Sequence, residues 1–294
     1  MADQLALKSG AGRRNKNIRG RINYVEMTIL YLILALLTVI YVVPFLWLLS
    51  SSLKSPTEIF RVPIVWIPEK LQWVNFVRAT TDISFFLYLR NTLTIIAGVL
   101  IGSLISNTLV AYAFSKIEWK GRNTLFIIVL ITMMMPYQII MIPQFLFFHA
   151  LGWTGTFLPL TVPAFFGNAF FIFLLRQFFI GIPNEISQAA RIDGANEFTI
   201  FSLIVLPLTK PAITTVAIFA FLNTWNDFLG PLIFLTSDRN YTLAIGIQQI
   251  MSVNDPRWNV LMAAGVLMTV PVLLLFFLLQ KYFIQGIAFT GIKG

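Results

Sequence analysis

The segment that decides the fold reads IPNEISQAARIDGANEFTIFSLIVLP and covers residues 182–207. Its apolar residues recur at helical spacing, with polar residues between them. Pro183 suits the first turn of a helix, and Gly194 suits the left-handed residue that ends one. Asp193 or Asn196 can cap a following helix. The segment therefore predicts a short amphipathic helix, a glycine turn and a second helix that runs to its end.

On both sides of this segment the chain is apolar in stretches long enough to cross a membrane. Of the 294 residues, 57% are hydrophobic and 11% are charged, against about 25% charged in a soluble domain. A spanning helix needs about 20 mostly apolar residues. The fold class predicted is an all-α polytopic membrane protein with six transmembrane helices. We expect these helices at Met27–Ser50, Leu89–Phe114, Thr124–Phe148, Phe157–Ile180, Leu208–Thr236 and Val260–Lys281.

The basic residues predict which side of the membrane each loop faces. If the N-terminus lies inside, fourteen Lys and Arg residues fall on the cytoplasmic side and seven outside, as the positive-inside rule requires. Residues 1–26 are then a cytoplasmic tail, residues 27–281 the six-helix domain and residues 282–294 a second cytoplasmic tail. Residues 182–207 form a cytoplasmic loop.

Composition also limits the chemistry that the chain can perform. The chain has no cysteine and a single histidine, His149, so a cluster of Cys or His metal ligands is not available. The phosphate-binding pattern G-x-x-x-x-G-K-[ST] does not occur in the sequence. We expect no cofactor or metal on this chain. The net charge of +9 is explained by membrane orientation, so no nucleic acid is expected as a partner.

The cytoplasmic segment allows two interpretations from its pattern alone. A short amphipathic helix held between two spans can seat in a groove of a soluble partner. It can equally lie on the lipid surface as an interfacial helix. The pattern does not choose between them.

The spacing within the segment resembles the signature loop of the permeases of ABC importers. Gln188-Ala189-Ala190 is followed by three residues and Gly194, and then by nine residues and Ile204-Val205-Leu206-Pro207. The family usually carries Glu where this chain has Gln188, and Glu185, one turn earlier, is a candidate to supply that charge. NTWNDFLGPLIFL (223–235), the pair Pro136 and Pro143, and the ending QKYFIQGIAFTGIKG are similar to carbohydrate importers of the maltose type, and to the smaller six-span permease in particular.

This resemblance implies a type I importer in the cytoplasmic membrane of a bacterium. Two homologous permeases would enclose the path, two separate ATPase subunits would bind ATP-Mg, and an extracytoplasmic protein would deliver the sugar. The chain itself would not be an enzyme. The terminal residues 282–294 are a second candidate contact with the ATPases. The residues that the resemblance assigns to ATPase coupling are Glu185, Gln188, Ala189, Ala190, Asp193, Gly194, Ile204, Leu206 and Pro207.

The fifth predicted span carries the candidates for the substrate path or gate, namely Asn223, Trp225, Asn226 and Asp227. Aromatic faces and amide or carboxylate groups are what a sugar needs, and an acid within a span is a functional candidate by default. Asp227 can equally cap a broken helix or hold an outer gate. Neutral oligosaccharides, uronate oligosaccharides of the alginate or pectin type, and glycerol phosphates all stay open as substrates. The loop Ser237–Asn259 is expected to face the binding protein.

Two other classes of protein compete with the ABC permease. An ion-coupled secondary sugar carrier needs several buried ionisable residues or an inverted repeat with broken helices, and Asp227 is the one candidate. A membrane enzyme needs a nucleophile, metal ligands or paired acids within its spans, and the sequence assembles none of these sets.

Overall fold

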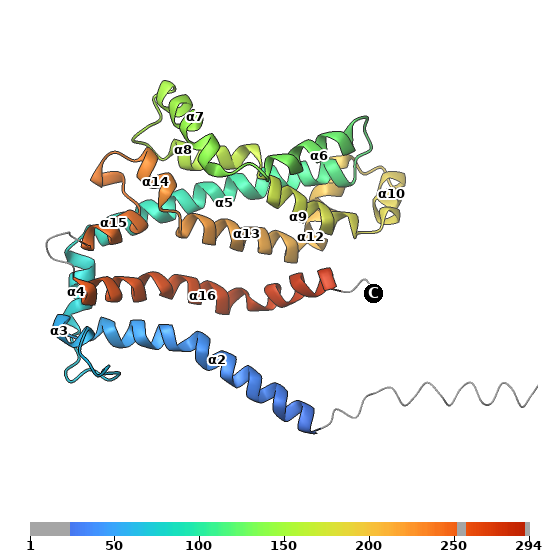
Figure 1. Ribbon diagram of the computed structural model, residues 1–294. Coiled ribbons are helices and arrows are strands. Elements are labelled where there is room, and N and C mark those ends of the chain that lie inside the picture. The colour runs from blue at the N-terminus through green and yellow to red at the C-terminus, as the bar shows by residue number, and fades with distance from the viewer. Residues whose placement is uncertain (1–23, 252–256, 292–294) are drawn as a thin grey trace, which may run out of the picture. The chain divides into compact units, whose positions relative to one another are not determined.

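The computed structural model describes residues 24–251 and 257–291, and its regular elements are helices (Figure 1). Within these described residues, four helices are long and apolar enough to cross a membrane, and the number rises to as many as six if each of two sharply bent pairs is one span. The all-α polytopic prediction is confirmed. The elements are α2 (Tyr24–Ser52), α3 (Pro56–Ile59), α4 (Val74–Thr81), α5 (Phe85–Ser115), α6 (Arg122–Thr132), α7 (Tyr137–Ala150), α8 (Leu158–Thr161), η1 (Val162–Phe166), α9 (Ala169–Ile180), α10 (Asn184–Ile192), α11 (Glu197–Thr199), η2 (Ile200–Val205), α12 (Leu206–Leu208), α13 (Lys210–Trp225), α14 (Leu229–Phe234), η3 (Asp238–Asn240), α15 (Leu243–Ile250) and α16 (Trp258–Gly291).

The chain divides into two compact units, residues 1–50 and 51–294. In the first unit the described part is almost all of α2, an apolar helix with Pro44 inside it. The hydroxyls of Thr28 and Thr38 donate to carbonyls four residues earlier, at 2.8 and 2.7 Å, so these polar atoms need no partner from the surroundings. A helix that is apolar on all sides needs lipid or protein around it.

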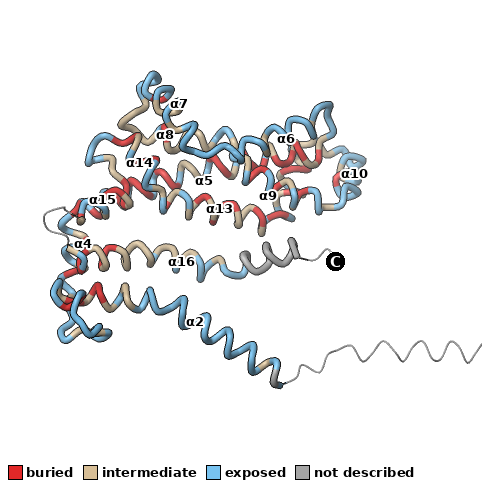
Figure 2. Tube along the Cα trace, in the orientation of Figure 1, coloured by how far each residue is buried: buried red, intermediate tan, exposed pale blue. Residues whose placement is uncertain are grey.

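In the second unit α5 is the central helix. One hydrophobic cluster gathers around Trp225 and Leu243 and includes Tyr88 and Ile96 of α5. A second cluster gathers around α9 and α13 and includes Tyr112, near the far end of the same helix. Buried positions follow α5, α9 and α13 in Figure 2. Because α5 belongs to both clusters, it connects the two ends of this unit.

The fourth predicted span, Phe157–Ile180, is interrupted in its middle. It consists of α8, η1 and α9, with a break at Gly167 and Asn168, where Gly167 has a positive φ of 89°. Buried Asn107 of α5 accepts a hydrogen bond from the Asn168 backbone N–H at 2.6 Å. The Asn168 side chain in turn accepts from Phe170 and Phe171 and caps α9. Broken helices are tolerated in a membrane where neighbours satisfy the freed backbone groups, and Asn107 performs that task here.

The third and fifth predicted spans are not straight helices. The third, Thr124–Phe148, consists of α6 and α7, which meet at 95° across a break that ends at Pro136. Proline has no N–H to donate and disfavours helical geometry in the residue before it. In the fifth, Leu208–Thr236, α13 ends at Trp225 and the residues beyond form the separate helix α14. A broken helix capped by Asp227 is one of the alternatives that the sequence left open for this span.

The ends of the chain differ from the predicted tails. The last helix, α16, continues past Lys281 to Gly291, so the described part of the predicted tail 282–294 is helical. Residues 1–23 of the predicted N-terminal tail 1–26 lie outside the described residues, and α2 begins at Tyr24.

Candidate functional site

Residues 182–207 form the predicted helix, glycine turn and second helix. Pro183 precedes α10 in extended geometry, and Asp193 ends it. Gly194 has a φ of +86°, a conformation that a residue with a side chain adopts only with strain. The Ala195 N–H donates to the Ala190 carbonyl at 2.9 Å, and the Asn196 side chain caps the second helix by accepting from the Thr199 N–H at 2.8 Å. Asn196 is thus the cap of the second helix, and Asp193 closes the first.

The second helix of the loop is irregular. After α11 it widens into the π-helix η2, in which Ile200 and Val205 are fully buried, and α12 follows with Pro207. Short π segments inside helices are frequent at functional sites. The three predicted coupling residues here differ in exposure, since Ile204 and Leu206 are half-buried and Pro207 is exposed. This helix therefore ties α10 to the core.

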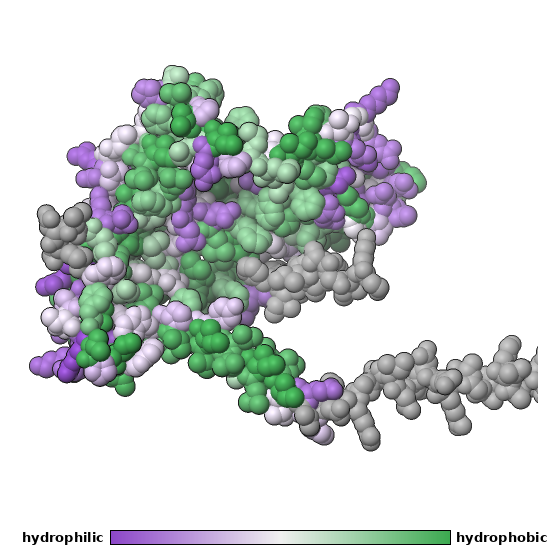
Figure 3. All heavy atoms as spheres, in the orientation of Figure 1, coloured by the Kyte–Doolittle hydropathy of each residue, from purple (hydrophilic) through white to green (hydrophobic). Residues whose placement is uncertain are grey.

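α10 stands at one end of the second unit (Figure 1) with most of its side chains exposed. Hydrophilic residues gather at this end of the molecule (Figure 3). Two apolar side chains are exposed among these hydrophilic residues: Ile192 is 87% exposed and Ile186 is 41% exposed. Ser187, on the same helix, is buried. Most of the predicted coupling residues in α10 and its turn are exposed, and Ala190 is half-buried. The exposed ones are Glu185, Gln188, Ala189, Asp193 and Gly194.

Polar contacts hold both ends of α10 against α5. On one side Lys116, at the C-terminus of α5, donates to the Ile182 carbonyl at 2.5 Å and to the Asn184 side chain at 2.9 Å. Lys116 is buried, and burial lowers the pKa of its ammonium group. An amine that is taken out of water needs such partners.

At the other end of α10 a charged group links the two helices of the loop. The Arg191 guanidinium pairs with Glu197 at 2.7 Å, and this hydrogen bond raises the pKa of Arg191. The second carboxylate oxygen of Glu197 accepts from the Tyr112 hydroxyl of α5 at 2.7 Å. The contacts between α5 and the loop join residues that are 66 to 85 positions apart in the chain. A local sequence pattern therefore did not indicate Lys116, Tyr112 or Glu197.

The four predicted path residues do not form one polar cluster. Trp225 is buried and stacks on Phe221 with ring centroids 5.6 Å apart, so its faces belong to the core. Asn223 and Asn226 are exposed. Asp227 accepts from the Gly230 N–H at 3.0 Å and so caps the break before α14, which is one of the roles that the sequence allowed.

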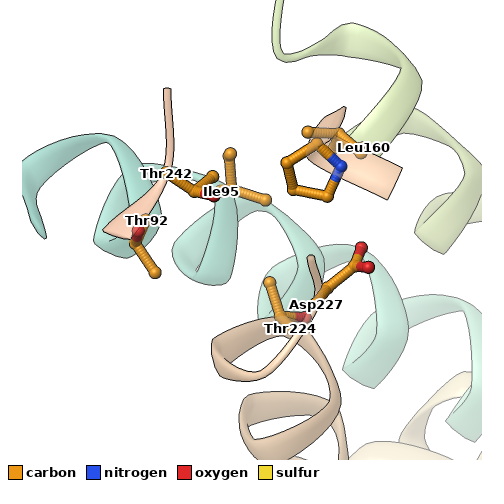
Figure 4. Close-up of a pocket in the computed structure, with 7 residues that line it drawn as sticks. Thr92, Ile95, Leu160, Thr224, Asp227 and Thr242 are labelled. Carbon is orange, nitrogen blue, oxygen red and sulfur yellow. The ribbon is translucent and has the colours of Figure 1, made fainter. Parts of the chain in front are cut away.

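Asp227 also lines a small cavity between α5, α8, α13, α14 and Thr242, the residue just before α15 (Figure 4). Its volume is about 40 Å³, which has room for a few water molecules but not for a sugar ring. Inside it the Thr242 hydroxyl is buried without a hydrogen-bond partner. The other lining residues are Thr92, Ile95, Leu160, Thr224 and Pro231.

Comparison with known proteins places the chain among transport permeases. It is 35% identical over 263 residues to the arabinooligosaccharides transport system permease protein AraQ of Halalkalibacterium halodurans, an alignment that covers 88% of this chain and 94% of that protein. It is 32% identical over 263 residues to the trehalose/maltose transport system permease protein MalG of Thermococcus litoralis, again with 88% and 94% covered.

Solved structures and a family model agree with these relatives. The fold is similar to a chain of a bacterial ABC transporter involved in the import of the acidic polysaccharide alginate, with a TM-score of 0.78, 25% identity, and 91% of this chain and 100% of that chain covered. The model of the binding-protein-dependent transport system inner membrane component matches residues 98–289. That range includes α10 with its glycine turn, and the chain is therefore a member of this family of multi-pass membrane permeases.

Proposed function

We propose that this chain is the smaller permease subunit of an ATP-driven, binding-protein-dependent oligosaccharide importer, and that α10 docks on a separate ATPase subunit. The observation that carries the proposal is the exposed α10, fixed at both ends by hydrogen bonds and presenting Ile192 beside polar side chains. A helix of this kind fits a groove of a soluble partner. Membership of the transport family supports a protein partner for α10 over lipid.

The other subunits follow from the same proposal. A second homologous permease completes the path, ATP-Mg is bound and hydrolysed on the ATPase subunits, and an extracytoplasmic protein delivers the substrate. Both termini and α10 face the cytoplasm. Residues 237–251 and 257–259 lie towards the binding protein, and residues 252–256 of the predicted loop lie outside the described residues. Glu185 supplies the negative charge of the docking face, because Gln188 is neutral.

Carbohydrate is the substrate class that the relatives support. Their names specify arabinooligosaccharides, trehalose or maltose, and alginate, which share a chain of hydroxyl-bearing rings and differ in charge. The cavity at Asp227 is too small for such a ring. The sugar therefore travels along a surface that this chain shares with the second permease.

The test is uptake by sealed vesicles that contain the two permeases, the ATPase and the binding protein. We expect uptake of labelled oligosaccharide only with ATP present and with the ATPase subunits assembled. Accumulation that persists without the ATPase and responds to a proton or sodium gradient would instead establish an ion-coupled carrier.

A further inference from the structure

The last turns of α5 hold both ends of α10. Tyr112 and Lys116 are four residues apart and therefore lie on the same face of α5. Tyr112 reaches the C-terminal end of α10 through Glu197 and Arg191. Lys116 reaches the N-terminal end through Ile182 and Asn184.

These contacts are built into the core. Tyr112 is 4% exposed and Lys116 is 8% exposed, and the Tyr112 ring packs on Phe201 with centroids 5.2 Å apart. A hydrogen bond in the low-dielectric interior is electrostatically stronger than the same bond in water. The chain enters α10 through Gly181-Ile182-Pro183 and leaves it through Gly194. The two contacts to α5 add a fixed point near each end of α10, beside its packing on the second helix of the loop.

The inference rests on the proposed function, in which the ATPase subunits move α10. We infer that Tyr112 and Lys116 are positioning residues that carry the movement of α10 into α5 as one rigid body. At 1.5 Å per residue, the 31 residues of α5 extend roughly 45 Å, and its first turns lie in the hydrophobic cluster at the opposite end of the unit. A displacement at α10 thereby reaches the other end of the bundle through one helix. Rigid-body switching between two packings is a common form of such transitions.

The test compares uptake with ATP hydrolysis in the complete importer in vesicles. Tyr112→Phe removes only the hydroxyl that reaches Glu197, and Lys116→Met removes only the ammonium group. For each variant the sugar transported is divided by the ATP that the bound ATPase subunits hydrolyse, and we expect this ratio to fall roughly fivefold or more. Ser115→Ala is the matched control, because its hydroxyl bonds to the Tyr112 carbonyl within α5 itself, and its ratio should equal that of the wild type.

A second measurement keeps the test independent of transport. Amide hydrogen exchange of residues 184–195 in the assembled importer should rise in Tyr112→Phe and not in Ser115→Ala. A wild-type transport ratio in both Tyr112→Phe and Lys116→Met would overturn the inference. So would a fall of uptake and hydrolysis in proportion to lost ATPase binding, because that result indicates a purely structural role. If the wild-type importer itself shows no uptake that depends on the ATPase, the proposed function fails instead.

Discussion

At the scale of single residues, the polar side chains within the apolar helices serve the backbone. Asn107 satisfies the break in the fourth span, and Asp227 caps the break after α13. In a membrane an unsatisfied backbone N–H costs several kcal/mol because no water is present to bond it. These residues therefore make broken helices possible, and the breaks give the bundle its shape.

Asn107→Leu should destabilise the protein by about 1–3 kcal/mol, because the Asn168 N–H loses the acceptor that the buried Asn107 side chain provides. The measurement is thermal unfolding of the purified permease complex in detergent, which should show a lower midpoint than the wild type. The control is Asn123→Leu, at an exposed position, which should leave the midpoint unchanged. Equal midpoints for both variants would show that Asn107 does not support the break.

Asp227→Asn should keep uptake within about threefold of the wild type, because asparagine caps a helix as well as aspartate does. Asp227→Leu removes the acceptor for the Gly230 N–H and should lower stability by about 1 kcal/mol and reduce uptake. Initial uptake rates in vesicles are measured for both variants. Loss of uptake in Asp227→Asn would mean that the negative charge itself is used, as in an ion-coupled carrier.

At the scale of elements, the shape of the docking segment depends on Gly194. A Cβ at this position would meet no atom within 4 Å, but the φ of +86° strains any residue with a side chain. The strain is about 1–2 kcal/mol for an ordinary residue, more for a β-branched one and less for asparagine. The glycine is thus required by backbone geometry and not by crowding.

Gly194→Val should reduce the amount of ATPase that copurifies with the permease, and uptake with it, because the turn would shift α10. Gly194→Asn, which tolerates the left-handed conformation, should retain most of both. Copurification from detergent-solubilised membranes measures the first quantity. If the valine and asparagine variants bind the ATPase equally, the turn is not what presents α10.

The elements show what the sequence could predict and what it could not. Helical periodicity and a glycine turn are local signals, and they were sufficient to predict α10, its stop and the second helix. The break at Gly167 and Asn168 was not predicted, because its support comes from Asn107, 61 positions away. The contacts of Tyr112 and Lys116 were missed for the same reason. Trp225 was a candidate for the sugar path from its type alone, and its burial depends on helices that the sequence does not place.

At the scale of the whole molecule, orientation in the membrane decides which end meets the ATPase. Because the chain has no cysteine, single-cysteine variants report accessibility without background. Asp193→Cys should react with a membrane-impermeant maleimide in inside-out vesicles and not in intact cells, whereas Lys70→Cys should show the reverse. The opposite pattern would place α10 outside the cell and would contradict the proposed topology.

The central claim is that the segment from Pro183 to Pro207 docks on an ATPase subunit and does not lie on lipid. The most direct measurement is photo-crosslinking from position 192 in the assembled importer, with a benzophenone amino acid in place of Ile192, which is 87% exposed. We predict a covalent product that contains the permease and the ATPase subunit. The same label at buried Ser187 should give no such product. Adducts of position 192 with lipid alone would contradict the claim.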